Sequence, residues 1–270
     1  MQDFGYQKET FNLSESLRYE LSIQAGLDGF LFLVKYQDEI ILLRHHRFSF
    51  PNENLMLRRA RDIFNEQEFT GRTFLKSEII ISSPGFTLIP HPLFSEKLAN
   101  RLLAGDTPAI PACETILMPF EFLNATLAFP VSASFLHYFR EIVPESVINH
   151  EVSFLLQNFF RLKSPALFIH LHDSWFYALS FSEGGPGFLN TFEYRSPDDF
   201  LYYYLSLTSL PELKGIPVWF SGNITEDHAC FNLARKYTGH ADIFRMVRDS
   251  VPAADSMKIA VHRLPGITLI

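Results

Sequence analysis

Residues 21–36 read LSIQAGLDGFLFLVKY, and residues 167–182 read LFIHLHDSWFYALSFS. In each stretch, apolar residues alternate with polar ones up to a short turn, and a more apolar run follows the turn, which is typical of a β-hairpin. Leu21 precedes Leu167 by 146 residues, and Phe30 precedes Phe176 by the same interval. The two hairpins therefore predict a duplicated unit.

The same order of elements follows each predicted hairpin: a third strand, a helix, an apolar strand, a second helix and a last strand. In the first half these are residues 40–48, 51–64, 78–81, 133–142 and 147–148. In the second half they are residues 188–194, 196–210, 216–220, 225–237 and 241–244. A meander that leads through a helix to a further strand builds a mixed sheet flanked by helices, so the expected fold class is α/β.

Proline content separates one segment from the rest of the first half. Seven prolines lie between residues 84 and 130, and they interrupt every predicted element there except a short helix at about 95–103. We expect residues 84–130 to form a Pro-rich insertion. The predicted lobes are residues 1–163, which carry the insertion, and residues 164–270.

Composition excludes several classes of protein. The formal net charge is −7, so the chain lacks the overall basic charge that attracts nucleic acid. The two cysteines, Cys113 and Cys230, lie far apart and lack the spacing of a zinc site or a disulfide framework. The polar start is not a signal peptide, and no apolar run is long enough to cross a membrane. We expect a cytoplasmic protein that binds neither nucleic acid nor membrane.

Two tandem halves with this order of strands resemble the actin-like ATPase fold, a duplicated ribonuclease H-like architecture. A closer resemblance, through residues 21–48 and the segment PVWFSGN at residues 217–223, is to an uncharacterised family of Bacteroidetes proteins described as having that fold. The resemblance covers nearly the whole chain. It implies a fold, but not an established activity.

The resemblance also implies two phosphate-binding loops, because actin-like enzymes carry Asp-x-Gly at the first hairpin of each half. The carboxylate orients hydrated Mg²⁺, and the glycine lets backbone amides approach the phosphates. The first loop here reads Gln24-Ala25-Gly26, which keeps only the glycine. The second reads His170-Leu171-His172, which keeps neither residue. Both loops are degenerate, so ATP and Mg²⁺ are not supported as cofactors.

A third actin-like element is a Gly-Gly pair beneath adenosine, and here it reads Ser221-Gly222. A strand-to-helix turn needs permissive residues without any ligand, so this match alone does not predict a nucleotide site. His170-x-His172 places two imidazoles on one face of a strand but has no third histidine nearby in the sequence. We predict no catalytic residue and no metal site. The residues predicted to line a ligand site between the lobes are Gln24, Gly26, His170, Ser221, Gly222 and Asn223.

Two functions from different classes fit these observations. The first is a non-catalytic actin-like protein that acts by binding a ligand or a protein, including a second copy of itself. The second is an ATP-dependent phosphotransferase or ATPase that takes its carboxylates from other positions, such as Asp28 or Asp173. The degenerate loops favour the first hypothesis.

Overall fold

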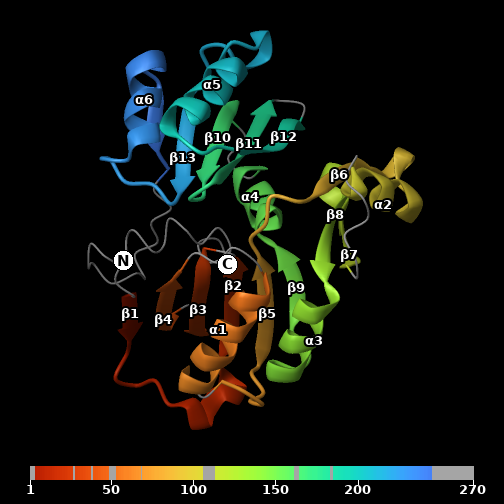
Figure 1. Ribbon diagram of the computed structural model, residues 1–270, viewed down its shortest axis with the longest axis vertical. Coiled ribbons are helices and arrows are strands. Elements are labelled where there is room, and N and C mark those ends of the chain that lie inside the picture. Colours follow the sequence, from red (N-terminus) through yellow and green to blue (C-terminus); the bar gives the residue numbers. More distant parts are fainter. Residues whose placement is uncertain are drawn as a thin grey trace. The chain divides into compact units, whose positions relative to one another are not determined.

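The structure is a computed structural model of the 270-residue chain. It describes residues 4–26, 28–37, 39–48, 53–67, 69–105, 113–160, 164–182 and 185–244. Two compact units are present, Met1–Glu151 and Val152–Ile270 (Figure 1). The predicted boundary residue 163 lies outside the described residues. The units divide after Glu151, because the helix that begins there packs within the second unit, where the rings of Phe159 and Phe168 stack with centroids 3.6 Å apart.

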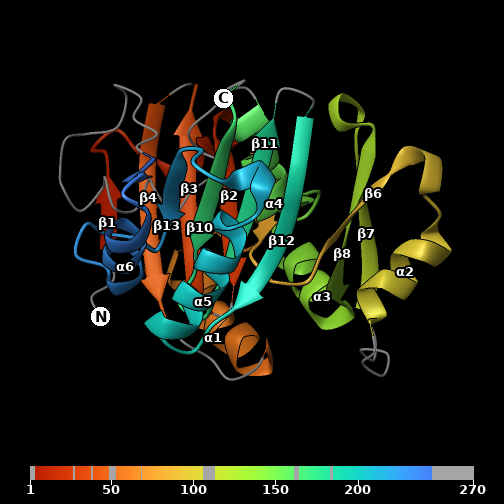
Figure 2. The same ribbon diagram turned by 90° about the horizontal axis from the view of Figure 1, so that it is seen from above.

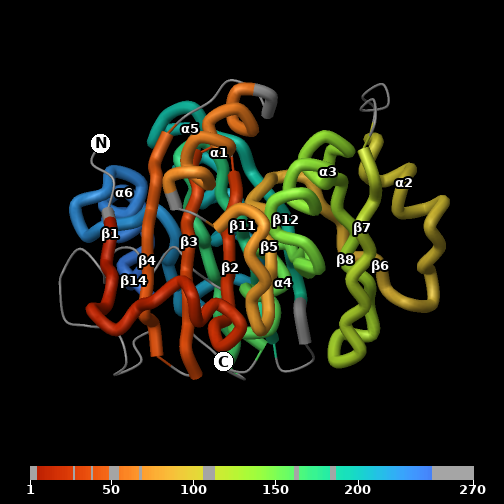
Figure 3. Tube along the Cα trace, turned by 90° about the horizontal axis from the view of Figure 1, so that it is seen from below, coloured from red at the N-terminus to blue at the C-terminus, as the bar shows by residue number. Residues whose placement is uncertain are grey.

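The first unit is built on a six-stranded mixed sheet. In spatial order the strands are β1 (Phe4–Gln7), β4 (Glu39–Arg47), β3 (Gly29–Tyr36), β2 (Glu20–Gly26), β5 (Lys76–Ile81) and β9 (Val147–His150). Strands β1 to β4 pair antiparallel, whereas β2, β5 and β9 run parallel. Figure 3 shows β1, β4, β3, β2 and β5 side by side in this order.

Two helices, α1 (Glu53–Gln67) and α3 (Ala133–Ile142), cover one face of this sheet (Figure 1). Their aromatic side chains meet those of β3: the ring of Phe64 lies 5.0 Å from that of Phe32, and the ring of Phe139 lies 6.4 Å from that of Phe30. All four are fully buried. The abundant phenylalanines therefore fill the space between sheet and helices.

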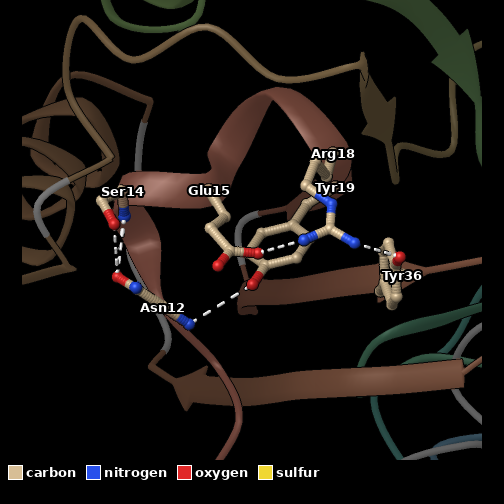
Figure 4. Close-up of polar contacts among 6 residues, drawn as sticks. All are labelled: Asn12, Ser14, Glu15, Arg18, Tyr19 and Tyr36. Atoms are coloured by element: carbon tan, nitrogen blue, oxygen red, sulfur yellow. Dashed lines mark hydrogen bonds and ion pairs between the residues drawn. The ribbon is translucent and has the colours of Figure 1, made fainter.

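A short 3₁₀ helix, Leu13–Arg18, leads into β2, and side-chain hydrogen bonds hold both of its ends (Figure 4). The Oδ1 of Asn12 caps it by accepting from the amide of Ser14 at 3.1 Å. At the other end, the guanidinium of Arg18 donates to Glu15 at 2.6 Å and to the hydroxyl of Tyr36 on β3. These contacts attach the entry of β2 to the neighbouring strand.

The Pro-rich segment is more ordered than its prolines predict. Its described residues hold a three-stranded antiparallel sheet, β6 (Thr87–Pro90), β8 (Ala125–Ser132) and β7 (Cys113–Phe120), together with the α-helix α2 (Glu96–Ala104) and two short 3₁₀ helices. The predicted helix at 95–103 is confirmed, but the prediction that the prolines interrupt every other element is wrong. Pro119 lies on the edge strand β7 and Pro130 near the end of β8, where a missing N–H removes few hydrogen bonds. Figure 2 shows this sheet next to α3, with α2 outermost.

The second unit repeats the plan of the first with a five-stranded sheet. Its strands in spatial order are β12 (Gly185–Glu193), β11 (Trp175–Ser182), β10 (Ala166–Leu171), β13 (Val218–Gly222) and β14 (Ala241–Ile243). The last three run parallel. Its helices are α4 (Glu151–Phe160), α5 (Pro197–Thr208) and α6 (Ala229–Thr238).

Helix ends in the second unit follow the predicted signals in part. Ser196 and Asp199 form a capping box at the start of α5, and Gly239, with φ of 66°, ends α6 as predicted. The predicted start of α6 at residue 225 is wrong. The helix begins at Ala229, because the side chain of His228 supplies the N-cap.

The duplication extends to the register of the strand pairs. The interval of 146 residues relates Ala25↔Phe30 to Leu171↔Phe176, and Phe30↔His46 to Phe176↔Phe192. The register also shifts after Val34 in the first meander and after Ser180 in the second, again 146 residues apart. A shared β-bulge at a matched position confirms the predicted duplication, with a mixed sheet in each half.

Candidate functional site

The predicted site residues all lie at the carboxyl ends of parallel strands, where open α/β sheets bind their ligands. In the first unit these ends belong to β2, β5 and β9, and in the second to β10, β13 and β14. The residues predicted for the first unit are Gln24 and Gly26, and those for the second are His170, Ser221, Gly222 and Asn223. We describe each strand-end cluster within its own unit.

Gln24 is the centre of the first strand-end cluster. Its Nε2 donates to the Oγ of Ser82 at 2.8 Å and to Oε1 of Glu151 at 2.9 Å. Ser82 follows β5, and Glu151 follows β9 as the first residue of α4. The carboxylate of Glu151 is fully buried, and the donated hydrogen bond offsets part of the cost of burying it. The amide at the position where actin-like enzymes carry the loop acid therefore already has protein partners.

A second set of polar contacts lies next to Gln24 on the same three strands. Glu78 on β5 accepts from the hydroxyl of Ser22 at 2.6 Å and from Nδ2 of Asn149 at 2.9 Å. Beyond the strand ends, the Oγ of Ser83 lies 3.3 Å from Nε2 of the buried His150. Sequence reasoning missed Glu78, His150 and Glu151. The alternation of Ser22 and Gln24 on one face of β2 was the available signal for a polar face there.

Gly26 is packed against its own chain. A Cβ at this position would lie 2.7 Å from Oδ1 of Asp28 and 3.2 Å from the carbonyl oxygen of Ser82. Asp28, offered above as a substitute metal ligand, therefore lies against the glycine of its own turn. The absence of a side chain at Gly26 serves this local packing.

The second strand-end cluster consists of imidazoles and aromatic rings. Nδ1 of His170 lies 2.9 Å from the Oγ of Ser221, and both residues are buried. His172 is also buried, and its ring stacks on that of Trp175 with centroids 4.4 Å apart and an interplanar angle of 14°. The hydroxyl of Tyr194 donates to the carbonyl oxygen of His172 at 2.6 Å. Burial raises the pKa of Tyr194, so its hydroxyl stays protonated and keeps this bond.

The turn after β13 is held tightly against β10. Gly222 has φ of +87°, and a Cβ there would lie 2.2 Å from the carbonyl oxygen of Leu171. The amide of Asn223 donates to the same oxygen at 2.7 Å, and its Nδ2 donates to Oδ1 of Asp173 at 2.9 Å. The turn needs Gly222 for its own geometry, and Asp173, the other substitute carboxylate, follows β10 and accepts a hydrogen bond from this turn.

Two titratable side chains, His228 and Cys230, lie at the start of α6. Nδ1 of His228 accepts from the amide of Cys230 at 3.3 Å, and burial lowers the pKa of His228. Burial also raises the pKa of the Cys230 thiol to about 11. A thiol with such a pKa stays protonated at neutral pH and is a poor nucleophile.

The structure brings His170, Ser221, Gly222 and Asn223 together on adjacent strands, as expected from their places in the sequence. Gln24 and Gly26 belong to the strand-end cluster of the first unit. Neither cluster has an aspartate at the matched hairpin position.

Among the described residues, no helix is long and apolar enough to cross a membrane.

Comparison with solved structures identifies the fold. A protein of unknown function with an actin-like ATPase fold from Bacteroides thetaiotaomicron superposes with a TM-score of 0.78 and 20% identity, over 87% of this chain and 94% of that one. The PilM–PilN type IV pilus biogenesis complex matches with a TM-score of 0.61 and 11% identity, over 93% and 99% of the two chains. The ethanolamine utilization protein EutJ from Carboxydothermus hydrogenoformans matches with a TM-score of 0.50 and 8% identity, over 93% and 89%. These similarities confirm the actin-like ATPase fold.

No curated protein matches the sequence. A family model does: the one described as "Protein of unknown function (DUF3822)" matches residues 8–240. This span includes both repeated meanders and every residue of the two strand-end clusters. The chain therefore belongs to the DUF3822 family.

Proposed function

We propose that this protein acts by binding a protein partner and does not hydrolyse ATP. The observation that carries the proposal is the state of the two matched hairpin positions. Where actin-like enzymes carry an acid, Gln24 donates to Ser82 and Glu151, and His170 is buried against Ser221. Both side chains are thus engaged within their own units, and neither is a carboxylate that would hold hydrated Mg²⁺.

The second loop also lacks room for phosphate. His172 occupies the place of the loop glycine and is buried in a stack with Trp175. A phosphate needs close approach to backbone amides, which a bulky ring at this place obstructs.

Exposed aromatic residues in the second unit support a protein partner. Tyr202 on α5 is 68% exposed and Tyr237 on α6 is 55% exposed. Tyrosine is enriched in protein interfaces because it buries a large apolar ring and keeps a polar hydroxyl. The fold also accommodates such a role, since the PilM neighbour is found in a complex with PilN. A second copy of the chain is included among the proposed partners.

A cytoplasmic location is part of the proposal. The buried Cys230 forms no disulfide, as is usual in a reducing compartment.

One observation favours the alternative, an ATP-dependent phosphotransferase or ATPase. The buried carboxylate of Glu151 lies 2.9 Å from Nε2 of Gln24, close to where the loop acid of an actin-like enzyme stands. Glu151 would then replace the missing aspartate as the group that orients hydrated Mg²⁺.

A titration with a fluorescent ATP analogue, with and without Mg²⁺, separates the two functions. We expect no saturable binding at micromolar analogue and no phosphate release from ATP. Saturable Mg²⁺-dependent binding together with phosphate release would contradict the proposal and favour the alternative. Loss of both signals in Glu151→Gln, but not in the control Glu121→Gln at an exposed residue between β7 and β8, would then assign the metal-orienting role to Glu151.

The protein-partner part of the proposal is tested by exchanging the exposed aromatics. Tyr202→Ser combined with Tyr237→Ser should abolish co-purification of a defined partner, or reduce self-association measured by light scattering. The control is Tyr6→Ser on β1 of the first unit. Unchanged association in the double variant would show that this surface is not the interface.

A further inference from the structure

A cavity of about 290 Å³ opens between α1 and α3 in the first unit, and none of its lining residues belongs to a strand-end cluster. Its lining residues are Arg61, Asn65, Thr70, Tyr138, Glu141 and Ile142. Five of these six side chains carry a polar or charged group. The volume suits a small polar molecule rather than a nucleotide.

Tyr138 is the buried polar residue of this cavity. The side chain is 4% exposed, and among the residues that the structure describes its hydroxyl has no hydrogen-bond partner. Its ring is held by Phe64 and Phe139, with centroids 6.2 and 5.2 Å away. Buried hydroxyl groups normally have a partner, and here the described residues leave the Tyr138 hydroxyl available to a bound molecule.

The charges around Tyr138 are of both signs. The guanidinium carbon of Arg61 lies 5.5 Å from the centre of the Tyr138 ring, and Glu141 lies one turn along α3. In the described part of the chain, neither Arg61 nor Glu141 forms an ion pair. Neighbouring charges do pair, since Arg59 lies 3.7 Å from Asp62 and Arg140 lies 3.7 Å from Glu114.

Both charged groups act on the Tyr138 hydroxyl. Burial raises the pKa of Tyr138, Glu141 and Asp62 raise it further, and Arg61 opposes them. The hydroxyl therefore stays protonated at neutral pH and is available as a donor.

We propose that this cavity binds a free α-amino acid. The guanidinium of Arg61 takes the carboxylate of the ligand, Glu141 takes its ammonium group, and the hydroxyl of Tyr138 donates to the carboxylate. A molecule with both charges pairs the cation and the anion of the cavity at once, whereas a simple anion or cation leaves one of them unpaired. The site does not depend on the proposed absence of ATP hydrolysis, because it shares no residue with the strand-end clusters.

The test uses the full chain and the twenty free L-amino acids, each compared with its N-acetyl and its carboxamide derivative by calorimetry and thermal shift. We expect saturable binding of at least one free amino acid and at least about tenfold weaker binding of both derivatives, because each loses one charge. Arg61→Gln and Glu141→Gln should each weaken binding by about tenfold or more. The control Arg140→Gln, on α3 beside Glu141 but outside the cavity lining, should leave the affinity for the amino acid unchanged.

Tyr138→Phe removes only the hydroxyl and keeps the ring, so it reports on the cavity without loss of folding. We expect this variant to melt at a higher temperature without ligand and to bind the amino acid several-fold more weakly. The proposal is overturned if no free amino acid binds below about 10 mM. It is also overturned if the derivatives bind equally well, or if all three cavity variants keep full affinity.

Discussion

The carboxyl ends of β2 and β10 have the same backbone arrangement but side chains of different chemistry. Gln24 and His170 are related by the same 146-residue interval as the strand pairs around them, yet Gln24 bonds to a hydroxyl and a carboxylate, whereas His170 lies among imidazole and aromatic rings. Strand register depends on the alternation of buried side chains, so duplication preserves it as long as the sheet faces stay apolar. The strand ends have no such constraint, and their side chains have diverged.

The turns beside these ends differ as well. Leu171 pairs with Gly222, whereas its counterpart Ala25 pairs with Ile81. In the second unit the main chain at Gly222 packs directly against Leu171. In the first unit the corresponding partner, Ile81, has a bulky side chain. The second end is therefore sterically tight, and the first is held by polar contacts.

The largest effect that this comparison predicts is that of Gly222→Ala. The new Cβ would lie 2.2 Å from the carbonyl oxygen of Leu171, at a φ of +87° that L-residues rarely adopt. We expect the free energy of unfolding to fall by about 3–5 kcal/mol, measured by denaturant titration of the full chain.

The matched control is Gly239→Ala. This position also has a positive φ, of +66°, but nothing lies within 4 Å of the added Cβ, so only backbone strain of about 1–2 kcal/mol is expected. Equal losses in the two variants would show that steric closure does not distinguish the second strand end.

Sequence patterns predicted the repeated sheets well because apolar alternation is a local signal. The hairpin at 21–36 and the apolar run at 78–81 correspond to observed strands, and the 146-residue interval holds through the register of both meanders. The Pro-rich segment was predicted poorly because proline lowers strand propensity on average, whereas its actual cost depends on whether the strand edge uses that N–H. Pro119 and Pro130 occupy positions where the cost is small.

The places of the candidate residues in the fold were predictable, but their contacts were not. Gln24 and His170 follow from the repeat alone, whereas the partners of Gln24 lie 58 and 127 residues away along the chain. Contacts of this kind form only when parallel strands bring their carboxyl ends together, which no local pattern encodes. The same holds for Glu151, because an acid at the start of a helix is favoured by the helix dipole whatever side chain it contacts.

Gln24→Ala tests how far the first strand end depends on its polar contacts. It removes the donor to Ser82 and to the fully buried carboxylate of Glu151, so we expect a loss of about 2–3 kcal/mol in the free energy of unfolding. The control Gln7→Ala, at an exposed residue of β1, should change stability by less than about 0.5 kcal/mol. If Gln24→Ala and Gln7→Ala lower the free energy of unfolding by the same amount, the Gln24 contacts do not stabilise the unit.

A smaller difference concerns the helices that precede the last strand of each sheet. The N-cap of α3 is the hydroxyl of Ser132, at 3.1 Å from the amide of Phe135, whereas that of α6 is Nδ1 of His228. Burial lowers the pKa of His228 from 6.5, so the folded state holds this proton less tightly than the unfolded chain does. Its contribution to stability is therefore present above pH 6.5 and is lost as the pH falls from 6.5 through the lowered pKa.

His228→Asn keeps a capping side chain but removes the titration. Between pH 7.5 and pH 5, we expect the parent to lose about 1 kcal/mol more of its free energy of unfolding than the variant does. Ser132→Asn in the first unit is the matched control and should leave the pH dependence unchanged. Parallel pH profiles for the parent and His228→Asn would show that this cap does not titrate in that range.

The smallest expected effect is on catalysis: Gln24→Asp should not create an ATPase. The substitution restores the loop acid beside Gly26, but it leaves the second strand end unchanged, with His172 stacked on Trp175 where phosphate must approach the backbone. Phosphoryl transfer depends on positioning and charge stabilisation together, so a single restored carboxylate supplies little of what is required. The new acid also stands next to Glu151 and replaces an amide donor by a like charge, which disfavours the geometry that a metal needs.

The measurement is Mg²⁺-dependent phosphate release by Gln24→Asp beside the parent and beside Gln24→Asn, which shortens the side chain without adding charge. Circular dichroism establishes that all three are folded before turnover is compared. Equal, background rates are expected, because the obstruction at the second strand end is common to the three proteins. Robust turnover in Gln24→Asp alone would mean that the first strand end controls catalysis and that the buried histidines of the second do not exclude phosphate, which reverses the contrast between the two ends.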